Sequence, residues 1–145
     1  MSQQKAILLL GSNIGDQNKN IDLAINQIEN KIGPIYNRSK KIMSEPVEFA
    51  SCNIFCNIAL SISTSLSPLQ LLKELKEIER NMGRIKDSRV FGEYADRIID
   101  IDIVEYNKLF FESNILTIPH KKHMEERQFS RELLLDLELS EKHRI

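Results

Sequence analysis

The sequence predicts an α+β fold, a ferredoxin-like sandwich with a mainly antiparallel sheet and helices on one face. Strand and helix patterns follow the order β-α-β-β-α-β, two segments have strong helical periodicity, and no repeat or linker interrupts the chain. With 145 residues, of which 41% are hydrophobic, the chain is long enough to bury one core. We therefore expect a single domain over residues 1–145.

The first half of the chain supplies one helix and three strands. Residues 6–10 are a continuous apolar run, typical of a strand buried on both faces. Apolar residues then recur at helical spacing over 21–32, and Gly33-Pro34 ends this helix. Residues 35–43 and 55–63 are predicted to be strands.

The second half begins with a well-defined helix. Ser67 is a suitable N-cap, Pro68 fits the first helical position, Gln70 completes a capping box and Gly83 suits the C-terminal end. The remaining elements are a charged loop at 84–96, a strand at 99–104, a short hairpin around Asn107-Lys108, an extended segment at 116–120 and a helix at 125–138.

Composition excludes some classes of function. A net charge of −1 argues against a generally basic nucleic-acid binder, and no apolar run reaches the ~18 residues of a membrane span. Because the N-terminus lacks the pattern of a signal peptide, we expect a cytoplasmic protein. Cys52 and Cys56 on one strand would be about 13 Å apart, too far for a disulfide, and are interpreted as small buried residues.

Asp100 and Asp102 are the first candidate site. They alternate with isoleucines, so both carboxylates point to one face of a strand, about 7 Å apart at their Cα atoms. Mg²⁺ binds one or two carboxylates together with substrate phosphates. The alternative is the solvated face of an edge strand, but the apolar flanks of this segment favour a central position.

Cationic residues precede this strand. Arg84, Lys86, Arg89 and Arg97 are suited to holding phosphate oxygens, although an ordinary solvated loop would have the same composition. Neither a Walker loop nor a dinucleotide-binding glycine motif occurs in the sequence. If ATP is the phosphate donor, another arrangement must bind it.

Two further groups have two interpretations each. His120 and His123 could begin a zinc site, but the sequence nearby offers no further histidine or cysteine, and the neighbouring lysines favour a phosphate contact. Phe55, Asn57 and Phe129 are either core residues or a clamp for a flat heterocycle, with the amide reading its edge.

Together these segments resemble the 6-hydroxymethyl-7,8-dihydropterin pyrophosphokinases of folate biosynthesis. The resemblance covers nearly the whole chain. It depends on five motifs in order: Gly11-Ser12-Asn13, Phe55-x-Asn57, Glu79-x-x-x-Gly83-Arg84, Arg97-x-x-Asp100-x-Asp102-Ile103 and Leu116-Thr117-Ile118-Pro119-His120.

The resemblance implies a ferredoxin-like fold and Mg²⁺-dependent transfer of the β,γ-diphosphate of ATP to the pterin hydroxymethyl group, releasing AMP. It implies that two Mg²⁺ ions are held by Asp100 and Asp102, and that Arg84 and Arg97 are catalytic. ATP would contact Glu79, Lys86, Arg89, Tyr94, Ile103, Thr117, His120 and Arg127. The pterin would contact Ser44, Val47, Phe55, Asn57 and Phe129. The partners would be ATP and a reduced pterin, with no nucleic acid or membrane, and we expect a monomer.

The sequence departs from the family pattern in three places. Phe55 stands where tyrosine is common, Tyr94 is the best match to an aromatic residue in a segment that is longer here, and one additional residue separates His120 from Arg127. Two rival functions remain: another metal-dependent transferase such as a nucleotidyltransferase, and a non-catalytic module that binds a small regulatory ligand or RNA.

Overall fold

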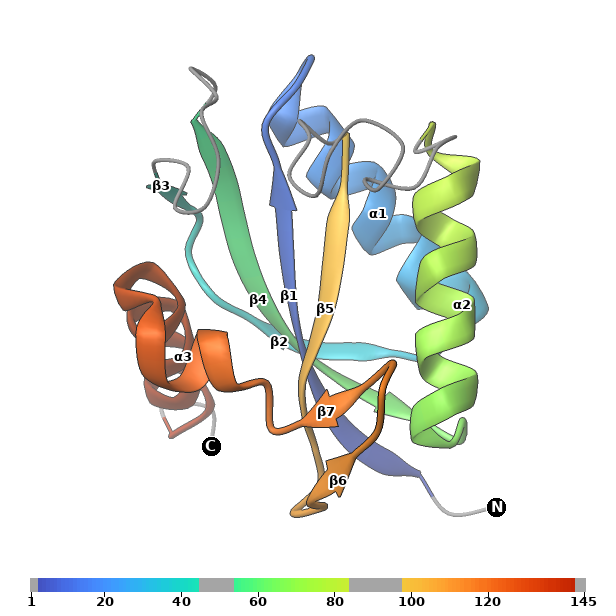
Figure 1. Cartoon of the computed structure of the whole chain (residues 1–145). Coiled ribbons are helices and arrows are strands. Elements are labelled where there is room, and N and C mark those ends of the chain that lie inside the picture. Colours follow the sequence, from blue (N-terminus) through green and yellow to red (C-terminus); the bar gives the residue numbers. More distant parts are fainter. Residues whose placement is uncertain (1–2, 45–53, 84–97, 143–145) are drawn as a thin grey trace.

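A computed structural model describes residues 3–44, 54–83 and 98–142. Its main sheet has the strand order β2-β4-β1-β5, all pairs are antiparallel, and β3 pairs with β4 (Figure 1). A separate two-stranded sheet joins β6 and β7. The elements are β1 (Gln4–Ser12), α1 (Gln17–Lys31), β2 (Ile35–Arg38), β3 (Ile42–Ser44), β4 (Phe55–Thr64), α2 (Pro68–Asn81), β5 (Asp100–Tyr106), β6 (Phe111–Glu112), β7 (Thr117–Ile118), the π-helix η1 (Lys122–Glu126) and α3 (Gln128–Lys142).

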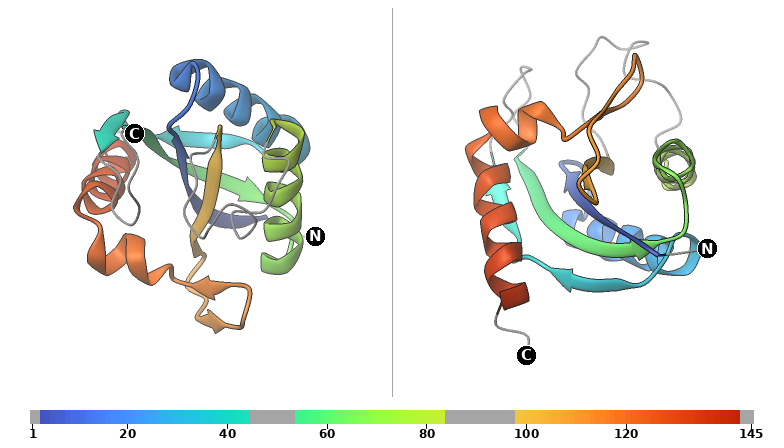
Figure 2. Two further views of the ribbon diagram at one scale, coloured as in Figure 1. Left: turned by 45° about the horizontal axis from the view of Figure 1, so that its top comes forward. Right: turned by 90° about the horizontal axis from the view of Figure 1, so that it is seen from below.

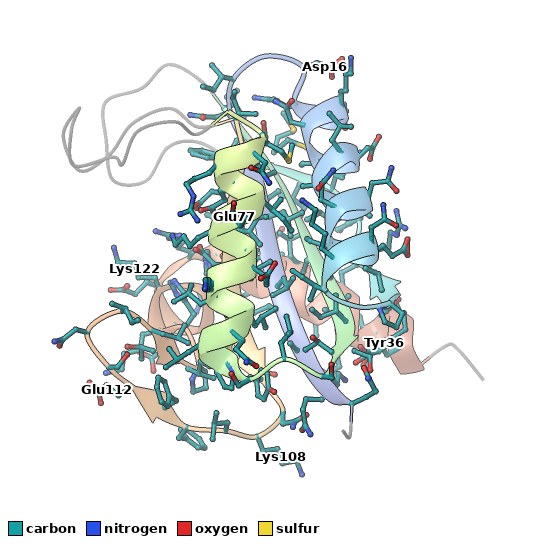
Figure 3. All side chains as sticks on the ribbon, turned by 90° about the vertical axis from the view of Figure 1, so that its right-hand side faces the viewer. Asp16, Tyr36, Glu77, Lys108, Glu112 and Lys122 are labelled. Carbon is teal, nitrogen blue, oxygen red and sulfur yellow. The ribbon has the colours of Figure 1, made fainter. Side chains whose placement is uncertain are left out.

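Helices α1 and α2 cover one face of the main sheet. Asp16 caps α1 by accepting from the Lys19 backbone N–H, and Ser67 forms the expected capping box with Gln70 (Figure 3 labels Asp16). The apolar faces of both helices pack on alternate residues of the strands, and this forms the larger core. The predicted ferredoxin-like fold is confirmed.

Helix α3 lies on the opposite side of the sheet from α1 and α2 (Figure 2). It buries a second, smaller core that includes Leu9, Leu133 and Leu137. The Asn37 side chain anchors it further, because Nδ2 donates a 2.9 Å hydrogen bond to the Leu137 carbonyl oxygen. The second face is therefore only partly open to a ligand.

Strand β5 lies at the edge of the main sheet, so the expectation of a central position was wrong. Its apolar residues are buried because α2 packs against it and because the chain after β7 covers its free edge. The His120 backbone N–H donates to the Val104 carbonyl oxygen at 3.0 Å. Covering an edge strand in this way prevents unwanted strand pairing.

Three other boundaries differ from the prediction. The strand at 35–43 is divided into β2 and β3, because the Ser39 Oγ, rather than a backbone carbonyl, accepts from the Ala59 backbone N–H. A turn does occur at Asn107-Lys108, but the strand after it pairs with β7 and not with β5. The helix predicted at 125–138 begins at Gln128.

The segment before α3 is a π-helix, in which the Arg127 backbone N–H donates to the Lys122 carbonyl oxygen, five residues earlier, at 2.9 Å. Such a turn holds one residue more than an α-helical turn. This turn lies between His120 and Arg127, the segment in which the sequence has one residue more than the family pattern. None of the helices in the described part of the chain is long and apolar enough to cross a membrane.

Candidate functional site

Strand β5 places Asp100 and Asp102 on one face, as the alternation predicted. Leu9, the partner of Asp102 on β1, belongs to the second core beneath α3, so both aspartates share the face on which α3 lies. The Asp102 side chain is 26% exposed, so solvent and ligands can reach it.

Two histidines approach the Asp102 carboxylate. The His123 Nε2 lies 2.7 Å from Oδ2, and the His120 Nε2 lies 3.9 Å from the same oxygen. Burial alone would raise the pKa of Asp102. The hydrogen bond from His123 and the nearby charges of His123, His120 and Arg127 outweigh it and hold this pKa well below its usual range. Asp102 is therefore ionised at neutral pH.

The His120 ring is half-buried, and its environment favours the neutral form. Burial lowers the pKa of His120, the charges of His123 and Arg127 lower it further, and Asp102 acts in the opposite direction. The side chain is 28% exposed and follows directly after β7. A neutral, accessible imidazole suits hydrogen bonding to a ligand.

These three side chains, Asp102, His120 and His123, have ligand atoms within 4.8 Å of one another. Mg²⁺ prefers oxygen ligands and keeps several waters, so it fits the aspartate oxygens, with the imidazoles as hydrogen-bond donors. The sequence interpretation dismissed a metal role for His-x-x-His because no third ligand lay nearby. The third side chain comes from β5, distant in sequence.

A second group of predicted residues meets where β3 pairs with the start of β4. Ser44 is the register partner of Phe55. The Asn57 Nδ2 donates to Ser44 Oγ at 2.7 Å and to the Ile42 carbonyl oxygen at 3.2 Å. These bonds fix the orientation of the amide. The structure thus brings together three of the five predicted pterin contacts.

Gly11 connects the two groups. In the strand register it is the partner of Asn57 on β4 and of Asp100 on β5, so the three residues form one row across the sheet. By the spacing of strands, the outer two Cα atoms are about 10 Å apart. A Cβ at Gly11 would lie 3.0 Å from Asn57 Oδ1 and 3.3 Å from the Phe55 ring. The Asn57 amide and the Phe55 ring therefore occupy the space beside Gly11, and only glycine fits there without displacing them.

Two predicted ATP contacts lie elsewhere. Glu79 is only 1% exposed, and its Oε2 accepts from the Ile101 backbone N–H at 2.7 Å. The Ile103 side chain is 2% exposed in the larger core, away from the aspartates. Both support β5 from the α2 side.

The remaining predicted residues of the described chain lie after β5. Thr117 is on β7 and lines a pocket with Phe110 and Lys121. Arg127 follows the π-helix, near enough for its charge to act on Asp102. Phe129 packs on the second core, with its ring centroid 6.5 Å from that of His123.

Six predicted residues lie outside the described residues, and their roles stay predictions: Val47, Arg84, Lys86, Arg89, Tyr94 and Arg97. Conversely, sequence reasoning missed Ser130, whose Oγ lies 2.6 Å from His123 Nδ1. It considered His123, with His120, as a zinc ligand or a phosphate contact and not as a partner of Asp102. The available signal was a polar residue seven positions after a histidine, which is too weak to single out Ser130.

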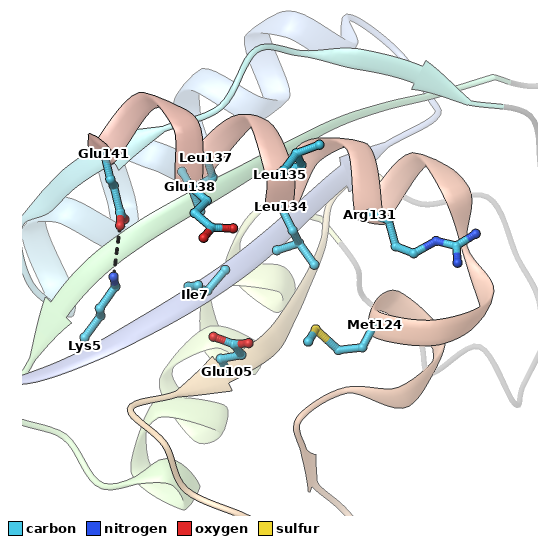
Figure 4. Close-up of a pocket in the computed structure, with 10 residues that line it drawn as sticks. All are labelled: Lys5, Ile7, Glu105, Met124, Arg131, Leu134, Leu135, Leu137, Glu138 and Glu141. Atoms are coloured by element: carbon cyan, nitrogen blue, oxygen red, sulfur yellow. Dashed lines mark hydrogen bonds and ion pairs between the residues drawn. The ribbon is translucent and has the colours of Figure 1, made fainter. Parts of the chain in front are cut away.

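A groove between α3 and strands β1 and β5 lies apart from these groups (Figure 4). Ile7, Met124 and Leu134 supply apolar lining, and Lys5 pairs with Glu141 at one end. None of the predicted site residues within the described ranges lines this groove. The aspartates and the Asn57 group therefore remain the candidate site.

Comparisons with known proteins identify the family of this chain. Residues 7–139 match the family described as 7,8-dihydro-6-hydroxymethylpterin-pyrophosphokinase. A 2-amino-4-hydroxy-6-hydroxymethyldihydropteridine pyrophosphokinase of Porphyromonas gingivalis is 35% identical over 133 residues, which are 90% of this chain and 88% of the relative.

Other relatives are much longer than this chain. The folic acid synthesis protein FOL1 of Dictyostelium discoideum is 38% identical over 84% of the chain, but the match spans only 18% of that relative. The wild-type HPPK-DHPS of Plasmodium falciparum, solved with STZ-DHP, has a TM-score of 0.67 at 17% identity. The match covers 93% of this chain and 40% of that structure, and at this identity it supports the fold alone.

Proposed function

Because the chain belongs to the 7,8-dihydro-6-hydroxymethylpterin-pyrophosphokinase family, we propose that it transfers diphosphate from ATP to 6-hydroxymethyl-7,8-dihydropterin. The pterin hydroxyl oxygen bonds to the β-phosphorus of ATP, and the bond between that phosphorus and the bridging α–β oxygen breaks. AMP leaves, and the hydroxyl proton passes to solvent. The product is the pterin diphosphate.

The observation that supports this assignment best is the row Asn57–Gly11–Asp100. A pterin held by Asn57 and Phe55 and a triphosphate held at the aspartates would lie on the same face of the sheet. Their reacting groups would meet near Gly11, which adds no side chain of its own between the two ends of the row. Phosphoryl transfer depends mainly on such positioning and on charge neutralisation.

The aspartates have the metal-binding role in this proposal. Asp100 and Asp102 would hold two Mg²⁺ ions, which neutralise phosphate charge when bound. Arg84 and Arg97, outside the described residues, would stabilise the transferred group, and His120, Thr117 and Arg127 would lie around the nucleotide. Glu79 would act on the ATP site through β5, since its side chain is buried.

One reaction tests the proposal against both rivals. The protein is incubated with MgATP and the hydroxymethyl-dihydropterin, and the nucleotide products are separated. AMP and pterin diphosphate in equal amounts are expected. Release of pyrophosphate would indicate nucleotidyl transfer, and no turnover by a folded sample would favour a binding module. Either result would overturn the proposal.

A further inference from the structure

A continuous hydrogen-bonded arrangement connects helix α3 to strand β5 through one histidine. The Ser130 Oγ lies 2.6 Å from His123 Nδ1, and His123 Nε2 lies 2.7 Å from Asp102 Oδ2. Ser130 is fully buried, and His123 is 1% exposed. We call Ser130, His123 and Asp102 the Asp102 triplet.

We infer that His123, fixed by Ser130, is a positioning residue for the metal-binding carboxylate of Asp102. The inference rests on the proposed function, because it assumes that Asp102 is a metal ligand. A hydrogen bond accepted at Oδ2 restricts rotation of the carboxylate and so restrains the direction of Oδ1. Removal of such a hydrogen-bond partner typically lowers metal affinity or activity about 10–100-fold.

The hydrogen bonds of the Asp102 triplet can form whether the His123 ring is neutral or protonated. In a neutral imidazole that bears its proton on Nε2, this N–H donates to Asp102, and the Ser130 hydroxyl donates to Nδ1. In an imidazolium, both ring nitrogens donate, and Ser130 accepts. Asp102 is the acceptor in each case, so the geometry persists across these protonation states.

His120 has a different position. Its Nε2 is 3.9 Å from Asp102 Oδ2, beyond hydrogen-bond distance, and its side chain is 28% exposed, against 2% for His123. His120 can therefore turn toward a ligand, whereas the ring of His123 is enclosed. The two histidines of His-x-x-His thus have separate tasks.

The order Ser, His, Asp resembles the catalytic triad of hydrolases, but the burial of Ser130 excludes that chemistry. A nucleophilic serine must reach the substrate, whereas Ser130, a residue of α3, is fully buried. In this protein the exposed end of the triplet is the aspartate. The structure therefore favours support of a ligand over covalent catalysis.

The test measures metal binding directly. Mn²⁺ is titrated into protein saturated with α,β-methylene-ATP, which cannot be cleaved at the reacting bond, and free Mn²⁺ is measured by electron paramagnetic resonance. His123→Ala should weaken Mn²⁺ binding about 10–100-fold. His123→Gln, which keeps a donor amide at similar reach, should recover part of this loss, and Ser130→Ala should give a smaller loss.

Asn37→Ala is the matched control, because it also removes a buried polar contact to α3, at Leu137, without touching Asp102. It should lower the melting temperature and leave the Mn²⁺ affinity unchanged. Unchanged Mn²⁺ affinity in folded His123→Ala, or an equal loss in Asn37→Ala, would overturn the inference. If His123→Ala does not fold, unchanged affinity in both Ser130→Ala and His123→Gln would do so.

Asp102→Ala distinguishes this inference from the proposed function. If Asp102→Ala keeps full activity and Mn²⁺ binding, the metal role of Asp102 is wrong, and the inference fails with it. If Asp102→Ala is inactive while His123→Ala binds Mn²⁺ normally, only the positioning role of His123 fails.

Discussion

The carboxylates of Glu79 and Asp102 lie on different faces of strand β5 and differ in how far they are exposed. Glu79 reaches β5 from helix α2, whereas Asp102 belongs to the strand itself. Glu79 is 1% exposed and accepts from the Ile101 backbone N–H, which on this edge strand points away from β1. Asp102 is bound by His123, but its side chain remains 26% exposed. The Glu79 carboxylate satisfies a backbone N–H at the edge of the sheet, whereas the Asp102 carboxylate remains accessible to a ligand.

We therefore expect Glu79 to contribute mainly to the stability of the fold and Asp102 mainly to catalysis. Removing a buried acceptor leaves a buried N–H unsatisfied, which costs folding free energy. Replacing a partly exposed metal ligand by a side chain of the same shape costs less stability but removes stabilisation of the transition state. Variants of Glu79 should therefore differ from the unaltered protein mainly in unfolding experiments, and variants of Asp102 mainly in turnover.

The largest effect is expected for Asp102→Asn. This change keeps the shape of the side chain and removes its charge, so turnover with MgATP and the pterin should fall on the order of 10³-fold. The melting temperature should change far less than this loss suggests. A variant that retains turnover within a factor of ten of the unaltered protein would contradict the metal role.

Glu79→Ala should show the opposite profile. The unpaired Ile101 N–H should lower the free energy of unfolding by about 2–3 kcal/mol, measured by urea denaturation. Turnover per folded molecule should fall much less than in Asp102→Asn. Glu77→Ala is the control, because Glu77 is a half-exposed residue of the same helix (labelled in Figure 3). It pairs with Arg80 at the surface, so its replacement should be nearly neutral.

Asn57→Ala extends the comparison to the other end of the row. Loss of one well-oriented amide should raise the KM for the pterin about tenfold, the equivalent of one hydrogen bond, with a smaller change in kcat. Ser44→Ala, which removes only the partner of the amide, should have a weaker effect on the same constant. An unchanged pterin KM in both variants would remove Asn57 from the site.

The smallest effect is expected at Glu141, a carboxylate on α3 far from β5's aspartates in the sequence. Burial would raise the pKa of Glu141, but hydrogen bonds from Ser61 and Lys5 and the charge of Lys5 lower it below its usual value of 4.5.

A lowered pKa stabilises the fold above the unfolded-state value and ceases to do so as the pH falls through the folded-state value. Glu141→Gln should therefore cost up to about 1 kcal/mol at pH 7 and less below pH 4.5, as measured by urea denaturation at several pH values. A cost that grows on acidification would contradict this assignment.

Local patterns in the sequence were sufficient for most elements of the fold. The capping box at Ser67 and the helical spacing of the isoleucines depend on neighbours within one or two turns, so they can be read directly. The edge position of β5 could not be predicted, because α2 and the segment after β7 bury its apolar residues in place of a neighbouring strand. Burial by distant segments leaves no periodic signal in the strand itself.

The candidate site also has a part that the sequence predicted and a part that it did not. Asp100, Asp102 and Asn57 were predicted from alternation and motif order, and the structure places them along one face. The contact between His123 and Asp102 joins residues that are 21 positions apart, and a π-helix determines where the imidazole lies. The frequency of such a helix is too low for sequence patterns to anticipate it.

The crowding at Gly11 has a consequence for ligand design. A single molecule meant to occupy both subsites would need a connector that spans about two strand spacings, or about 10 Å, from Asn57 to Asp100. A methyl group at Gly11 would press on the Asn57 amide and the Phe55 ring, which lie 3.0 and 3.3 Å from its position. Gly11→Ala would therefore disturb the Asn57 end of such a molecule before the Asp100 end.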